Sequence, residues 1–169
     1  MKTPNKILIG SSSGLVEAPY ERLISLLLDV QSGMVGGSRI PFILSGLTQA
    51  STSANLDIRG GPEHFTVYST GVHVSRLVNV EVLRKEALVA IYGGYWYRGE
   101  YTLEQHQKGT LIKLSIYNIA PGFTKVFVPF LKEYRQLRNG YSSSNPRNPA
   151  FEAFLESIGK QLACKACTI

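Results

Sequence analysis

Long apolar runs, dense charge clusters and cysteines are all scarce in this chain of 169 residues. No run approaches the roughly 18 apolar residues that a membrane-spanning helix needs. The N-terminal segment MKTPNKILIGSSSG has lysines but only a very short apolar run, below the roughly 7–15 residues of a secretory signal. These absences predict a cytoplasmic protein.

Charge is also sparse, because charged residues make up 18% of the chain and the net charge is +6. The basic residues are scattered, and the nearest approach to a patch is the set Lys125, Lys132, Arg135 and Arg138. Nucleic-acid binding requires a denser basic stripe within a known motif. We therefore expect no nucleic-acid partner, and at most weak contact with an anionic membrane surface.

The two cysteines, Cys164 and Cys167, lie in the C-terminal tail ACKACTI. A C-x-x-C pair can be a redox centre or half of a zinc site. No second Cys/His pair with zinc spacing accompanies it, so we interpret the segment as a frayed tail with two ordinary thiols. The histidines show no metal spacing, and the glycine pairs lack the context of a phosphate loop. We expect no metal and no cofactor.

Aromatic residues are abundant, with nine tyrosines and seven phenylalanines. Five of the tyrosines lie in the stretch 92–120, which alternates with a period of two and predicts an antiparallel hairpin with one buried face. Its first strand places four residues on one face: Tyr95, Tyr97, Tyr101 and Leu103. Its second strand places Ile112, Leu114, Ile116 and Asn118 on one face.

The remaining pattern predicts an α+β protein that forms one domain over residues 1–169. A strand over 5–16 is followed by short helices, the first of which begins near Pro19. Strands then occupy 54–92. After Pro121 the apolar period changes to 3.6, and a last helix begins at Pro149. We expect a curved antiparallel sheet of about six or seven strands around a long C-terminal helix.

Three segments resemble START-like (SRPBCC) proteins: NKILIGSSSGLVEAPYERLISLLLDV, YRGEYTLEQHQKGTLIKLSIYNI and AFEAFLESIGKQLA. They are similar to the opening strand and helix, the late hairpin and the closing helix of that superfamily. The segments 38–53 and 121–148 depart from the pattern. The resemblance implies a helix-grip fold with a deep apolar cavity, in a superfamily that includes lipid carriers, aromatic polyketide cyclases and chaperone activators. It does not select one chemistry.

Candidate ligand-binding residues are those expected to face such a cavity: Arg76, Tyr95, Tyr97, Tyr101, Asn118, Phe127 and Tyr134. A tyrosine combines an apolar ring with a hydroxyl, which suits an amphipathic ligand, but a tyrosine stripe also fills a core. Arg76 interrupts a valine face, either as a cation within the cavity or as an edge residue that reaches solvent. Asn118 could bind a ligand or cap its strand. The aromatic stripe from Phe123 to Tyr134 could line the cavity mouth or pack on the sheet.

Three functions are compatible with this pattern. The chain could bind an apolar or amphipathic small molecule such as a lipid, isoprenoid or polyketide. It could be an enzyme of the cyclase or aromatase kind, with Tyr95, Tyr101 or Arg76 acting on the ligand. It could be a protein-interaction module that uses the outer sheet face around Trp96, Arg98 and Glu100. The absence of an evident acid–base pair among the inward residues favours the binder.

Overall fold

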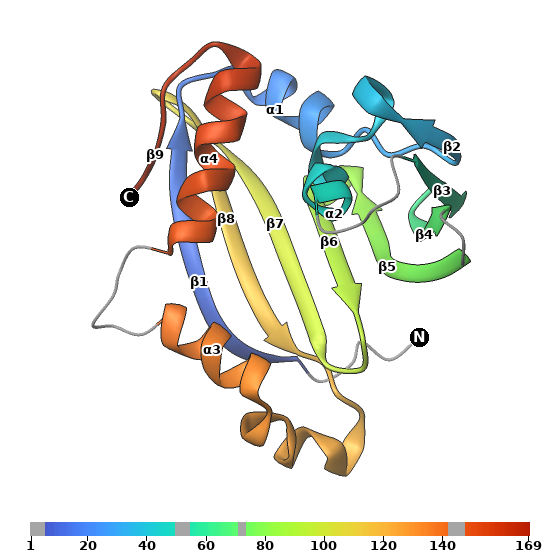
Figure 1. Ribbon diagram of the computed structural model, residues 1–169. Helices are drawn as coiled ribbons and strands as arrows, with labels where there is room; N and C mark the ends of the chain where they lie inside the picture. The colour runs from blue at the N-terminus through green and yellow to red at the C-terminus, as the bar shows by residue number, and fades with distance from the viewer. Residues whose placement is uncertain (1–5, 50–54, 71–73, 142–147) are drawn as a thin grey trace.

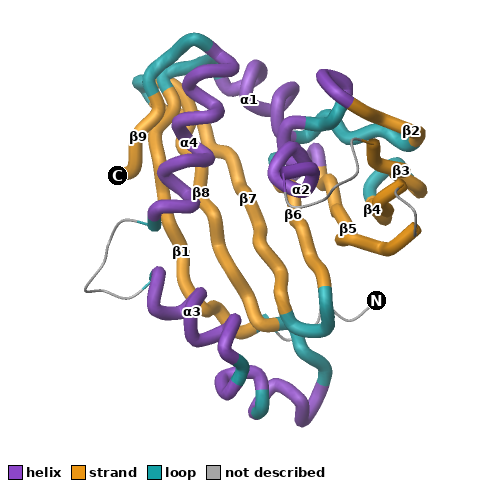
Figure 2. The backbone as a smooth tube through the Cα atoms, viewed as in Figure 1, coloured by secondary structure: helices purple, strands orange, loops and turns teal. Residues whose placement is uncertain are grey.

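The computed structural model describes residues 6–49, 55–70, 74–141 and 148–169, which form an α+β fold (Figures 1 and 2). The strands are β1 (Ile7–Val16), β2 (Gly33–Gly36), β3 (Asn55–Gly60), β4 (His64–Thr70), β5 (Val74–Leu83), β6 (Leu88–Gly93), β7 (Tyr97–His106), β8 (Gly109–Asn118) and β9 (Ala166–Thr168). The α-helices are α1 (Tyr20–Leu27), α2 (Ser45–Gln49), α3 (Lys132–Gly140) and α4 (Pro149–Leu162). The short 3-10 turns are η1 (Gly37–Arg39), η2 (Phe42–Leu44), η3 (Arg84–Glu86), η4 (Gly122–Val126) and η5 (Val128–Phe130).

All nine strands join one antiparallel sheet in the order β2-β3-β4-β5-β6-β7-β8-β1-β9. The sheet is therefore larger than the six or seven strands predicted. The additional edge strands β2 and β9 have four and three residues, too few for an alternating pattern to be visible. β9 corrects the interpretation of the tail, because Cys167 pairs with Leu15 of β1 instead of fraying.

The predicted hairpin is confirmed as β7 and β8, with Tyr101 opposite Leu114 and Gly99 opposite Ile116. Gly109 restarts the chain after the turn with a φ of +137°, a conformation that favours glycine. A side chain there would also clash with the backbone of Val16 and of the residues that follow it. The glycine thus allows the hairpin end to lie against the exit of β1.

The helices cover one face of the sheet, which we call the inner face (Figure 1). α4 buries an apolar stripe against it: Phe151, Leu155, Ile158 and Leu162. Gly14 of β1 provides the closest approach, since a Cβ there would lie 2.5 Å from Cδ1 of Leu155. α1 adds Leu23 and Leu27 to the same core cluster. The C-terminal helix therefore packs on the sheet, as the periodicity predicted.

The apolar stripe from Phe123 to Leu137 contains Pro129, which predicts a kink or two consecutive pieces, and the structure does divide the stretch. It is divided into η4, η5 and α3. Pro129 lies within η5, and α3 begins only at its N-cap residue Leu131, whose carbonyl accepts the first helical hydrogen bond from Arg135 N. Residues 142–147, within the predicted loop, lie outside the described part of the chain. The segment 38–53 forms short helical turns as far as residue 49, and the rest of it also lies outside the described residues.

Candidate functional site

A cavity of about 420 Å³ lies between β7 and β8 on one side and α3 and α4 on the other. This volume is within the range of roughly 300–1,000 Å³ typical of small-molecule sites. The floor comes from the inner face of the hairpin, and the walls come from the two helices. The lining residues are Tyr97, Tyr101, Leu114, Ile116, Glu133, Gln136, Leu137, Gly140, Tyr141, Asn148, Ala150, Phe151 and Phe154.

Tyr97 and Tyr101 lie on the cavity floor, four residues apart on the same face of β7. Between them, Gly99 makes room for a phenol, because a Cβ at Gly99 would lie 2.7 Å from the Tyr97 hydroxyl. Tyr101 packs against α4, with its ring centroid 4.9 Å from that of Phe154. The missing side chain at Gly99 therefore helps to hollow the floor.

Burial governs the acidity of the tyrosines around this cavity. It raises the pKa of Tyr97 and of Tyr101 above the ordinary value, and the negative charge of neighbouring phenolates would raise that of Tyr101 further. Burial and the charge of Tyr97 raise the pKa of Tyr141 to about 12, although a hydrogen bond with Ser12 acts in the opposite direction. All three phenols are therefore neutral at physiological pH and can donate O–H hydrogen bonds.

The helical walls are held by two specific contacts. Tyr141 lies directly over Gly10 of β1, where any side chain would clash with its Cβ and ring. Asn148 caps α4, since its Oδ1 accepts a hydrogen bond from the backbone N of Phe151 at 3.0 Å. Asn is a preferred residue at this position because its short side chain reaches the free N–H groups of the first turn. The cap therefore contributes to the wall as well as to the helix.

The cavity lining is poor in groups that transfer protons near neutral pH. Glu133 is the one carboxylate among the lining residues, and it is exposed. The other polar lining side chains are phenols and amides: Tyr97, Tyr101, Gln136, Tyr141 and Asn148. Within the described residues, no group of three or more His, Cys, Asp or Glu side chains could hold a metal ion. The arrangement is suited to hydrogen bonding within an apolar site.

Of the seven candidate residues, Tyr97 and Tyr101 line this cavity and the other five do not. Arg76 is exposed and donates a hydrogen bond to Asn79 Oδ1. The cause is a β-bulge: Val67 pairs with Val78 but Tyr68 pairs with Arg76, so Leu77 is an extra residue. The bulge reverses the alternation. Arg76 is therefore opposite Tyr68 and is not a member of the valine face.

Tyr95 and Asn118 flank the end of the cavity floor without contributing to it. Tyr95 precedes β7 in the turn after Gly94, and its side chain is 51% exposed. Asn118 is buried, and its Oδ1 accepts a hydrogen bond from the backbone N of Ala120 at 2.9 Å. The strand-capping alternative therefore describes Asn118, and Tyr95 is a turn residue.

Phe127 and Tyr134 occupy the segment beyond β8. Phe127 is 53% exposed and does not line the cavity. Tyr134 is buried in a small second cluster with Ala120 and Val128, where its ring centroid lies 5.7 Å from that of Trp96. Phe127 and Tyr134 thus belong to different environments, although a single helical stripe would have placed them together.

Sequence reasoning did not select several of the residues that form the walls. Phe154 was assigned to the apolar stripe of the last helix, and Leu137 to the stripe after Pro121. Tyr141 follows α3 in a polar, serine-rich context that gives no periodic signal. Only the tertiary packing of α3 across β1 brings Tyr141 toward the sheet.

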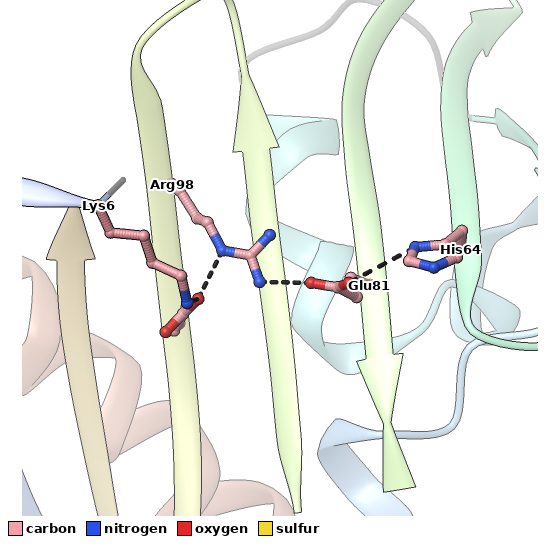
Figure 3. A network of polar contacts seen from close by, with 5 residues as sticks. Lys6, His64, Glu81 and Arg98 are labelled. Atoms are coloured by element: carbon pink, nitrogen blue, oxygen red, sulfur yellow. Dashed lines mark hydrogen bonds and ion pairs between the residues drawn. The ribbon is translucent and has the colours of Figure 1, made fainter. Parts of the chain in front are cut away.

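The opposite, outer face of the sheet has a row of alternating charges (Figure 3). Lys6 pairs with Glu100, Arg98 Nε donates to Glu100 Oε1 at 2.5 Å, and Arg98 also pairs with Glu81. Glu81 lies 3.7 Å from Nδ1 of His64. Burial alone would lower the pKa of Arg98, but hydrogen bonds and charges from Glu81 and Glu100 raise it. Arg98 and Glu100 are therefore engaged within the chain, while Trp96 packs on Tyr97 and Tyr134.

A larger hollow of about 740 Å³ lies between the end of α1, β2 and the turns η1 and η2. Half of its lining residues are polar: Ser25, Asp29, Gln31, Ser32, Ser38, Arg39, Ser45 and Gln161. It contains none of the buried phenols. We therefore place the candidate site in the smaller cavity, where apolar surface and hydrogen-bond donors coincide.

Comparison with known proteins does not assign the chain to a family. No protein-family model matches it, and no curated protein matches its sequence. Among solved structures, it is similar to the crystal structure of TTHA0849 from Thermus thermophilus, with a TM-score of 0.45 and 16% sequence identity. The similarity covers 90% of this chain and 97% of that one. It is too distant to support an argument about function. Of the helices described, none is long and apolar enough to cross a bilayer.

Proposed function

We propose that this protein binds an apolar or amphipathic small molecule, such as a lipid, isoprenoid or polyketide, in the cavity between the β7–β8 hairpin and helices α3 and α4. The observation that carries the proposal is a 420 Å³ space with an apolar lining and three neutral phenols. An apolar ligand would gain free energy from leaving water. The phenols would select ligands that carry a hydrogen-bond acceptor.

We also propose that the fold is of the helix-grip, START-like kind. In support, the opening strand is followed by helix α1, and the C-terminal helix α4 packs on the inner face of the sheet, with Leu155 against Gly14 of β1 and Phe154 against Tyr101 of β7. The cavity adjoins that helix. The nine-stranded sheet and the divided segment between β8 and α4 are features that the sequence resemblance did not include.

The positions of the polar groups suggest how a ligand would lie. Tyr97 and Tyr101 lie on the cavity floor on β7, and Tyr141 lines the cavity from the end of α3. Glu133 and Gln136 belong to the first two turns of the same helix and are exposed. We infer that an acceptor group of the ligand reaches the phenols, while any strongly polar group stays near α3 and solvent.

An enzyme of the cyclase or aromatase kind is the second candidate, favoured by one observation. Neutral phenols in an apolar cavity can donate hydrogen bonds to an enolate oxygen as charge develops there. Proton abstraction would need a base, and the one carboxylate in the lining, Glu133, is exposed. Binding without turnover is therefore the function that the described geometry supports best.

A titration with a dansyl-labelled fatty acid tests the binding proposal. Leu114→Trp would fill the cavity, and Lys113→Trp on the same strand is the matched control because Lys113 faces outward and is exposed. Leu137→Trp on α3 is a second filling variant if Leu114→Trp fails to fold. We expect saturable binding by wild type and Lys113→Trp, with affinity at least about tenfold weaker in a filled variant. Equal affinity in all folded variants would refute the site.

A further inference from the structure

Exposed hydrophobic side chains gather at one end of the sheet. Nine large hydrophobic residues are exposed in the described part of the chain, and seven of them lie at this end: Ile7, Leu8, Tyr95, Phe123, Val126, Phe127 and Phe130. The register establishes the location, because the start of β1, the start of β7 and the end of β8 meet where Asn118 pairs with both Ile7 and Tyr97. A concentration of this kind marks an interaction surface.

Four of these residues belong to the segment 122–130, which projects beyond the sheet in Figure 1. Phe123 is 75% exposed and Phe130 is 74% exposed. The backbone that presents them is ordered by hydrogen bonds from Thr124 N to Pro121 O and from Phe130 N to Phe127 O. Val128 lies between the exposed positions and is fully buried against Ala120 and Tyr134. The phenylalanines are therefore held outward by an anchored turn.

Basic residues accompany the exposed phenylalanines. Residues 121–141 contain four basic residues and one acidic residue, a net charge of +3 within a chain of net charge +6. On α3, Lys132, Arg135 and Arg138 recur every three residues on the exposed side of the helix. Tyr134 is buried on the side of α3 opposite Lys132, and Arg138, four residues after Tyr134, is exposed at the edge of that buried side. Apolar side chains flanked by cations are the composition that binds at the interface of an anionic membrane.

We propose that this end of the molecule, formed by η4, η5 and α3, docks on the surface of an anionic lipid bilayer. The phenylalanines insert among the lipid headgroups, and the cations of α3 contact lipid phosphates or carboxylates. Charge favours this partner over a second copy of the chain, because a copy would bring the same excess of positive charge to the contact. The proposal does not depend on a ligand in the cavity.

Vesicle co-sedimentation tests the proposal with full-length protein. The vesicles contain either phosphatidylcholine alone or phosphatidylcholine with phosphatidylserine. The variants are Phe123→Ser/Phe130→Ser and Lys132→Glu/Arg135→Glu. Their matched controls are Met34→Ser, at an exposed hydrophobic residue outside the cluster, and Arg84→Glu/Lys85→Glu, in η3 at the opposite end of β6. All altered side chains are exposed, so circular dichroism should match that of wild type.

We expect wild type and both controls to sediment with phosphatidylserine vesicles and to dissociate as salt is raised. The phenylalanine variant should lose about tenfold or more in partitioning, and the charge-reversal variant should lose a similar factor on anionic vesicles only. The proposal would be overturned if wild type sedimented with neither kind of vesicle, or if the phenylalanine and charge-reversal variants sedimented as wild type does. Light scattering that detects a dimer dissociated by Phe123→Ser/Phe130→Ser would also overturn it, because the occupant would then be a second copy.

Discussion

The ring of Tyr101 on β7 and the ring of Phe154 on α4 lie with their centroids 4.9 Å apart, tilted by 45°. This contact joins the sheet to the C-terminal helix at the edge of the cavity. Phe154 also contacts Phe42 of η2, with centroids 5.9 Å apart. The aromatic cluster therefore connects the cavity wall to the core beside α1.

Tyr101→Phe tests whether the phenol binds a ligand, because it removes the hydroxyl and preserves the ring contact with Phe154. A neutral hydrogen bond contributes about 1 kcal/mol, so affinity for a ligand with an acceptor group should fall about fivefold. The titration with dansyl fatty acid measures this change. Tyr68→Phe, on the outer face, is the matched control and should bind as wild type does. An unchanged affinity in Tyr101→Phe would remove this phenol from the site.

Gly10→Ala should disturb the cavity through the wall that α3 provides. The added methyl group would overlap Tyr141 at its Cβ and ring, so the end of α3 must move. Overpacking of this kind lowers the free energy of unfolding by about 1–3 kcal/mol. Urea unfolding measures the loss, and ligand titration should show weaker binding. Gly46→Ala in α2 is the control, since its Cβ would meet nothing within 4 Å. Equal stability of the two variants would contradict the contact.

The buried phenols predict a loss of stability at high pH. The pKa values of Tyr97, Tyr101 and Tyr141 are raised above the ordinary value of 10.0, so their full contribution to stability is present below about pH 10. That contribution is lost as pH rises from there through the folded-state values, such as about 12 for Tyr141. Urea unfolding at a series of alkaline pH values should therefore give a shallower decline for Tyr101→Phe/Tyr141→Phe than for wild type. Identical slopes would argue against burial of these groups.

We expect the row of alternating charges on the outer face to stabilise the folded protein. The side chains of Arg98 and Glu100 are only 12% and 6% exposed. Arg98→Ala would therefore leave the buried Glu100 carboxylate paired with Lys6 but no longer with Arg98. Removing one partner of a buried pair typically lowers the free energy of unfolding by about 3–5 kcal/mol. Chemical denaturation measures the change, and Glu100→Gln added to Arg98→Ala should recover part of it.

The matched control for this row is Arg59→Ala, whose pairing with Asp57 lies at the surface, with the Arg59 side chain 63% exposed. Solvent screening limits such pairs to about 1 kcal/mol or less. If Arg59→Ala lowered the free energy of unfolding as much as Arg98→Ala does, burial of the charged row would not determine how much the row stabilises the fold.

Much of the fold was predictable because its long elements repeat one period. The alternation from Tyr95 to Leu103 and the helical stripe from Phe151 to Leu162 both persist over several residues, and both elements are confirmed, although the strand begins at Tyr97. β9 was not predicted because three residues carry no period, and its partner β1 is distant in the sequence. Local pattern identifies a face, but it does not identify the neighbours of a short edge strand.

The candidate site was less predictable, because tertiary details override the alternation. A bulge at Leu77 moved Arg76 to the other face, and nothing in the local sequence marks that bulge. The segment after Pro121 divides near Pro129, as that proline predicted, but the helical stripe did not predict that Phe127 would be exposed. Tyr97 and Tyr101 were identified correctly as inward residues of β7. Tyr141 enters the lining only through the packing of α3.

The central claim is that the space between the β7–β8 hairpin and helices α3 and α4 holds an apolar molecule. Native mass spectrometry of the protein purified from its host measures this most directly, with Leu114→Trp and Lys113→Trp prepared in parallel. We predict a discrete added mass, extractable into organic solvent, on wild type and Lys113→Trp but absent from Leu114→Trp. Wild type that carries no added mass and gains none when offered lipid extract would contradict the claim.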